Sequence, residues 1–346
     1  MLQYLKFLLL FPLFGAALEL TFVASIHCPH SPLPHLEDTN LLYIGQRPRF
    51  STCTAVAWFP DQHHLMSANL IANTMQIVDY NEEEGSLSAR QFFSPLLGTQ
   101  LAKPEHLCFS PDGTLLAVAN GGGGKITFYA VSKESSTIDP NPIAVLKESG
   151  KAKFHSVRFS PNGRYLACLT FDNEAKISIY KIVQEEKGLS FIRSQSFANP
   201  YSFIKPKGID FSPDQRFIAI CYSRRALWNP NENLQGVAEI YSFDAAVGRM
   251  NPSPISRIEA NLSVPEDIIF DPLDPYLFIS NQGNDTITVH EFNPESGMFQ
   301  EPLHTCLKNP GAQLSFPHGI AISRNGTFLA SSNYGDDKIT VYKIQR

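Results

Sequence analysis

Short segments of apolar, or alternating apolar and polar, residues run along most of the chain, separated by clusters of Asn, Asp, Gly and Pro. The unit is clearest between Phe316 and Ile344, where three such segments are joined by two tight turns, at 323–326 and 334–337. Segments of this length bounded by turn residues predict antiparallel β-strands. No long amphipathic helix pattern accompanies them, so the chain is predicted to be all-β.

The same unit occurs six times. The last apolar residue of each first strand serves as an anchor, and the anchors lie 51, 50, 52, 59 and 52 residues apart. They are Trp58, Phe109, Phe159, Phe211, Phe270 and Ile322. The turn after each anchor mostly has Ser or Asp, then Pro, then Asp or Asn, which favours a type I turn because proline presets φ. Six such turns in register indicate an internal repeat.

A unit of about 50 residues with three clear strands and a weaker fourth is typical of a β-propeller blade. We therefore predict one six-bladed β-propeller of four-stranded antiparallel blades over residues 18–346, with a seven-bladed ring as the alternative. The last unit has only three strands, so an N-terminal strand is expected to complete it and remove an exposed sheet edge. The predicted donor is Leu41–Gly45, ahead of the first anchor.

Several motifs resemble a known family. They are Pro317-His318-Gly319-Ile320, the turn Ser110-Pro111-Asp112-Gly113, and the strand ends at 117–120 and 278–281. They resemble the YVTN-type repeat and the lactonase-like propellers around 6-phosphogluconolactonase, over residues from about 50 to 344. The resemblance implies a propeller and, in some members, hydrolysis of sugar lactones. Members with that activity usually have seven blades, whereas this chain has six repeats.

The first strand of each blade lines the channel of a propeller, so the repeat alignment selects a ring of residues. Two residues before each anchor, all six positions are apolar. Four residues before the anchors stand Thr54, Glu105, His155, Lys207, Glu266 and His318, and one residue later stand Ala55, His106, Ser156, Gly208, Asp267 and Gly319. One mouth of the channel is therefore predicted to be polar and charged.

This ring is the candidate site. The candidate catalytic residues are His155, His318, Glu105 and Glu266, because a His or Glu can activate water. Together these four side chains can also hold a divalent metal ion, whose identity stays open. The candidate ligand-binding residues are Lys207, His106 and Asp267. The ammonium group of Lys207 can stabilise the negative charge of an oxyanion. The competing interpretation is that these residues are polar only because water reaches any channel mouth.

The longest interval between anchors contains an enlarged link, residues 222–237, predicted on the same face as the ring. The guanidinium groups of Arg224 and Arg225 are candidates to bind a phosphate or carboxylate. The indole ring of Trp228 is a candidate to stack on a sugar or peptide. The alternative is a tolerated surface insertion. The Asn residues that end several second strands, such as Asn120 and Asn281, are expected to be turn residues.

Composition limits the remaining choices. The 346 residues carry a net charge of -5 and no basic tract, so nucleic acid is not an expected partner.

Residues 1–17 are apolar after Lys6 and fit either a cleaved signal peptide or an apolar arm packed on the fold. A signal peptide would place the protein outside the cytoplasm. Residues 1–17 are too short to span a bilayer. The six cysteines form no metal-ligand spacing and are expected to be buried thiols, which favours a reducing compartment instead.

Two functions remain open at this point. The first is a monomeric propeller that binds a small polar ligand at its channel mouth and hydrolyses sugar lactones. The second is a non-enzymatic platform of the WD-repeat type that binds a protein partner around Trp228.

Overall fold

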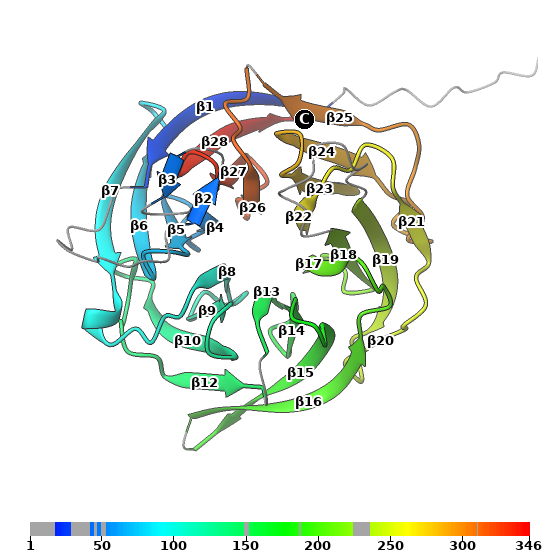
Figure 1. Cartoon of the computed structure of the whole chain (residues 1–346), viewed down its shortest axis with the longest axis horizontal. Coiled ribbons are helices and arrows are strands. Elements are labelled where there is room, and N and C mark those ends of the chain that lie inside the picture. Colours follow the sequence, from blue (N-terminus) through cyan, green and yellow to red (C-terminus); the bar gives the residue numbers. More distant parts are fainter. Residues whose placement is uncertain are drawn as a thin grey trace, which may run out of the picture.

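The computed structural model describes residues 18–28, 42–44, 47–49, 53–148, 152–186, 188–223, 236–309 and 311–346. Apart from one two-stranded hairpin, their strands form six antiparallel sheets that stand radially around a central channel (Figure 1). In five of these six sheets the strands follow the order of the sequence from the channel outward, and in the sixth the outer strand comes from the N-terminal part of the chain. The structure confirms the predicted six-bladed β-propeller.

The blades have the following bounds, from the innermost strand outward. Blade one comprises β4 (Cys53–Trp58), β5 (His64–Asn69), β6 (Thr74–Asn81) and β7 (Ser86–Phe93), and blade two comprises β8 (Pro104–Phe109), β9 (Leu115–Asn120), β10 (Lys125–Ser132) and β12 (Ala144–Lys147), with β11 (Thr137–Ile138). Blade three comprises β13 (Phe154–Phe159), β14 (Tyr165–Thr170), β15 (Lys176–Glu185) and β16 (Gly188–Ala198). Blade four comprises β17 (Lys205–Phe211), β18 (Phe217–Ser223), β19 (Gly236–Asp244) and β21 (Ser256–Ile258), with β20 (Arg249–Met250). Blade five comprises β22 (Pro265–Phe270), β23 (Tyr276–Asn281), β24 (Thr286–Glu291) and β25 (Thr305–Lys308), and blade six begins with β26 (Pro317–Ile322), β27 (Phe328–Asn333) and β28 (Lys338–Gln345).

An N-terminal strand closes the ring, but it is not the predicted one. The outer strand of blade six is β1 (Glu19–His27), which pairs antiparallel with β28 from Glu19 opposite Gln345 to His27 opposite Lys338 (Figure 1). The predicted donor was wrong: β2 (Leu42–Ile44) pairs with β3 (Arg47–Arg49) in a short hairpin. Length explains the difference, because only β1 is long enough to cover the eight-residue edge of β28.

The core lies between the blades. Six clusters of buried apolar side chains fill the six spaces between neighbouring sheets, and the cluster between blades six and one contains Cys28 and Cys53. Each strand face therefore packs against the next sheet, which explains why apolar residues occupy both faces of the middle strands. All six cysteines are free thiols, as predicted, and five of them are buried.

The turns after the inner strands have the predicted chemistry. Ser110 Oγ donates a hydrogen bond to Asp112 and accepts one from the Leu115 N–H at 3.0 Å. The same pair of bonds recurs in the turns at Ser160, Ser212 and Ser323. The repeated Ser-x-Asp/Asn pattern therefore fixes the angle between the first and second strand of each of these blades.

The Asn residues at the ends of the second strands do more than end a strand. Asn120 is buried, accepts a hydrogen bond from the Ala102 N–H at 2.8 Å and donates one to Thr127 Oγ1 on the third strand at 3.2 Å. Asn281 makes the equivalent bonds, to Ser263 and Thr288. As expected, each ends a strand and donates a hydrogen bond to its own chain, at the carbonyl two residues before it. In addition, each connects the link that enters its blade to the third strand.

Candidate functional site

A β-bulge at the start of every inner strand brings the charged residues together. In an unbroken strand, neighbouring residues point to opposite faces of the sheet. The pairing register of the inner strands skips Thr54, Glu105, His155 and Glu266 singly, and skips the pairs 207–208 and 318–319. A bulge re-aims the extra residue. Both predicted levels of the ring therefore face the channel at the amino ends of the inner strands, which we call the amino-end mouth.

The centre of this mouth is a buried ion pair. Lys207 Nζ, on blade four, lies 3.1 and 3.0 Å from the two carboxylate oxygens of Glu266 on blade five. The side chains are 10% and 4% exposed. Burial alone would raise the pKa of Glu266, but the ammonium of Lys207 holds it far below its usual range. Glu266 is therefore a carboxylate throughout the neutral range.

Two imidazoles lie against this pair. Nε2 of His155 is 3.3 Å from Glu266 Oε2, and Nε2 of His318 is 3.6 Å from the same oxygen. The two rings stack across the channel with their centroids 5.4 Å apart, and His318 stacks on Tyr334 on its other side. Burial lowers the pKa of both imidazoles, and the ammonium of Lys207 lowers that of His155 further. Both rings are therefore neutral at neutral pH.

The tautomer of His155 follows from its second nitrogen. Nδ1 lies 2.9 Å from the carbonyl oxygen of Lys207. A carbonyl oxygen only accepts hydrogen bonds, so Nδ1 carries the proton and Nε2 presents its lone pair to the channel mouth. His155 is therefore set as a proton acceptor or a metal ligand there.

Glu105, on blade two, completes the cluster. Its carboxylate approaches Gly121, where a Cβ atom would lie 2.8 Å from Oε1. The glycine after β9 therefore leaves room for this carboxylate. Donor atoms of Glu105, His155 and His318 all lie within 4.8 Å of one another, and Glu105 is the most exposed of the three.

The ring is buried rather than solvated. His155, Lys207, Glu266 and His318 have exposed fractions of 3%, 8%, 4% and 6%. The interpretation that these residues are polar because water reaches them does not fit this burial. They are held by one another.

The second predicted level lies just inside the channel. His106 Nε2, on blade two, is 3.5 Å from Asp267 Oδ2 on blade five, and the guanidinium of Arg158 on blade three is 3.3 Å from the same oxygen. Burial lowers the pKa of His106 to about 4, and the Arg158 charge acts in the same direction. Asp267 stays ionised because Arg158 and His106 outweigh the effect of burial on its pKa. These residues form a support beneath the ring rather than part of its surface.

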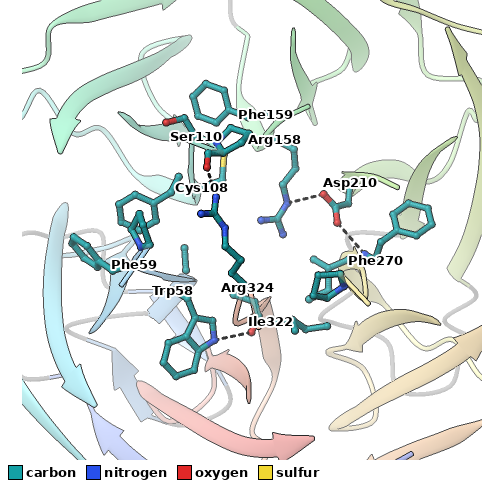
Figure 2. Close-up of a pocket in the computed structure, with 17 residues that line it drawn as sticks. Trp58, Phe59, Cys108, Ser110, Arg158, Phe159, Asp210, Phe270, Ile322 and Arg324 are labelled. Atoms are coloured by element: carbon teal, nitrogen blue, oxygen red, sulfur yellow. Dashed lines mark hydrogen bonds and ion pairs between the residues drawn. The ribbon is translucent and has the colours of Figure 1, made fainter. Parts of the chain in front are cut away.

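The other end of the channel, at the carboxyl ends of the inner strands, contains a hollow of about 320 Å³ to which all six blades contribute. Figure 2 shows Arg158 directed at Asp210, and Arg324 extending across the hollow, where it donates a hydrogen bond to the carbonyl of Pro111. Burial raises the pKa of Asp210 to about 6. No predicted site residue lies in this hollow.

Sequence reasoning missed Arg158 and Asp210, although a signal was present. Both stand one residue before an anchor, where the other four blades have Ala57, Cys108, Ile269 and Ala321. Extending the repeat alignment to that position would have shown two opposite charges at a channel-facing level.

The predicted ligand-binding residues Arg224, Arg225 and Trp228 lie outside the described residues. Among the described residues, no helix is long and apolar enough to cross a membrane.

Six four-stranded blades around a channel, with a buried His, Lys and Glu cluster at one mouth, define a β-propeller with a candidate catalytic centre. A family model described as "Lactonase, 7-bladed beta-propeller" matches residues 35–149 and 239–346, more than half of the chain. The protein belongs to this lactonase family of β-propellers, as the resemblance implied. The family is described with seven blades, whereas the described residues form six, and the unmatched interval contains the inner strands of blades three and four.

Individual relatives are more distant. Protein YwcC of Lactococcus lactis is 32% identical over 113 residues, so the match spans 32% of each chain, about a third of the relative's length. Among solved structures, a candidate 6-phosphogluconolactonase of Bacteroides uniformis is similar with a TM-score of 0.59 and 19% identity, over 84% of this chain and 80% of that one. The periplasmic gluconolactonase PpgL of Pseudomonas aeruginosa has a TM-score of 0.55 and 18% identity, over 75% and 71%. At these identities the solved structures show the fold alone. The family match does not favour the WD-repeat alternative.

Proposed function

We propose that this protein hydrolyses a sugar lactone at the amino-end mouth. The observation that carries the proposal is the neutral His155, whose Nε2 lone pair is aimed at a cluster that also holds an ammonium and carboxylates. Hydrolysis of a lactone needs a proton acceptor for water and a positive charge near the carbonyl oxygen. Membership of the lactonase family supports the same reaction class.

The roles follow from the contacts. Nε2 of His155 takes a proton from water as the water oxygen bonds to the lactone carbonyl carbon. The ammonium of Lys207, 3.4 Å from that nitrogen, stabilises the negative charge that develops on the carbonyl oxygen. The ring carbon–oxygen bond then breaks, and the proton on His155 passes to the leaving alkoxide. Because the ring residues are buried, the substrate lies over the mouth rather than inside the channel.

The test is hydrolysis of glucono-lactone and of its 6-phosphorylated form, followed by acid release and corrected for the spontaneous reaction. His155→Gln is expected to abolish enzymatic turnover while the unfolding transition is retained. His290→Gln is the matched control, because His290 is equally buried but faces Thr288 on β24, away from the channel. Unchanged turnover in the His155 variant would remove the ring as the catalytic centre.

A further inference from the structure

Nε2 of His155 faces Glu266 Oε2 at 3.3 Å, and both atoms are acceptors once Nδ1 has the ring proton. Two lone pairs at this separation repel unless a positive charge lies beside them. Lys207 supplies one such charge, because its Nζ contacts both Glu266 oxygens and lies 3.4 Å from His155 Nε2. His318, whose Nε2 lies 3.6 Å from the same Glu266 oxygen, and the carboxylate of Glu105 add a third and a fourth electron-rich donor. This corner of the mouth therefore has the electrostatics of a cation site.

We propose that Glu105, His155 and His318 bind one zinc ion, or a similar first-row divalent ion, at the amino-end mouth. Imidazole nitrogen suits zinc and its neighbours, whereas calcium and magnesium prefer all-oxygen sites. Three protein ligands with a free fourth position are the arrangement of catalytic zinc sites, in which the remaining ligand is water. A metal-bound Nε2 of His155 cannot also take a proton from water, so this binding proposal is separate from the hydrolysis proposed above and does not depend on it.

The geometry fits with small movements. Ligand atoms about 2.1 Å from a tetrahedral zinc ion lie roughly 3.4 Å apart. The present donors lie within 4.8 Å, so side-chain shifts of about 1 Å bring them to that separation. Both imidazoles have orienting partners: the Lys207 carbonyl holds His155, and stacking on His155 and Tyr334 holds His318. Such outer contacts fix the rings of metal-ligating histidines.

Glu266 is excluded from the ligand set although its Oε2 lies 3.3 and 3.6 Å from the two imidazoles. Lys207 contacts both of its oxygens, so its charge is already balanced by an ammonium, and a metal ion bound to it would lie against that ammonium. The metal proposal therefore makes a prediction that would not follow if Lys207 and Glu266 served only as an ion pair. Removing the Lys207 charge frees Glu266 as a fourth ligand and takes a repelling ammonium away, so metal affinity should rise.

The experiment uses the full chain freed of metal with a chelator and titrated with Zn²⁺ by calorimetry, with Co²⁺ absorption as a report of coordination geometry. The wild type is expected to bind one equivalent, and His155→Gln, His318→Gln and Glu105→Gln are expected to lose at least 100-fold in affinity. Lys207→Met is expected to bind at least tenfold more tightly. His290→Gln should bind as the wild type does.

Two results would overturn the proposal: no stoichiometric Zn²⁺ binding by the wild type, or equal affinity in the wild type and Glu105→Gln. The latter variant covers the case in which a histidine variant fails to fold, because Glu105 is the partly exposed member of the cluster. Zinc binding without lactone hydrolysis would refute the proposed function and leave this inference standing. Lactone hydrolysis by a protein that binds no Zn²⁺ would do the reverse.

Discussion

The buried pair of Lys207 and Glu266 allows a quantitative test of how the channel is held together. Removing one partner of a buried ion pair leaves an uncompensated charge and typically costs about 3–5 kcal/mol. We expect Glu266→Gln and Lys207→Met each to lower the free energy of unfolding by that amount, since both side chains are at most 10% exposed. The double variant leaves no unpaired charge, so it should cost at least about 2 kcal/mol less than the sum of the single variants.

The assay is denaturant unfolding at pH 7 with all variants compared at equal m-values. The control is the pair of Lys338 and Asp336, which has the same 3.0 Å separation but side chains 25% and 31% exposed, and whose removal should cost below about 1 kcal/mol. The pKa of Glu266 is lowered in the folded state from 4.5, so its contribution is present above about pH 4.5 and is lost as the pH falls. Additivity of the two single variants at pH 7, within about 0.5 kcal/mol, would refute the reasoning.

Three further predictions concern other parts of the ring. Because burial raises the pKa of Asp210 from 3.8 to about 6, this carboxyl contributes stability that is lost as the pH rises between those values; Asp210→Asn should remove about 3 kcal/mol of that pH dependence in unfolding titrations. Asn281→Ala removes buried hydrogen bonds to Ser263, Ile279 and Thr288 and should cost about 2–3 kcal/mol in denaturant unfolding, whereas the exposed Asn284→Ala should cost below about 0.5. Deleting residues 18–28 leaves the edge of β28 unpaired, so size-exclusion chromatography should show aggregates that the full chain does not form, and a monodisperse product would contradict the closure argument.

The fold was largely predictable because its signal is repeated. A Ser-Pro-Asp turn that occurs once is weak, but similar turns at six positions, separated by five nearly equal intervals, define the blade length and place the inner strands. The closing strand was not predictable from the same signal, because it has no copy elsewhere in the chain. Both 20–25 and 41–45 show strand-like patterns, and only the full pairing of β1 with β28 separates them.

The members of the charged cluster could be selected from the sequence, but their geometry could not. The alignment selected Glu105, His155, Lys207, Glu266 and His318 because charges cluster at one level of the repeat. It did not predict the bulges that turn adjacent residues such as Glu266 and Asp267 to the same side, since strand periodicity places them on opposite faces. It also did not predict that the cluster is buried, because burial depends on how closely opposite blades approach.

That approach follows from the number of blades. In a six-bladed ring each blade has one directly opposite, and the contacts across this channel join such pairs: His155 of blade three stacks on His318 of blade six, and His106 of blade two faces Asp267 of blade five. A seventh blade would widen the ring and separate these partners, since the diameter of a closed ring grows with the number of its units. At the same repeat positions, a seven-bladed ring would therefore hold such side chains farther apart across the channel. The chemistry of this mouth depends on six blades, so its residues have to be tested in this chain rather than transferred by position from seven-bladed members of the family.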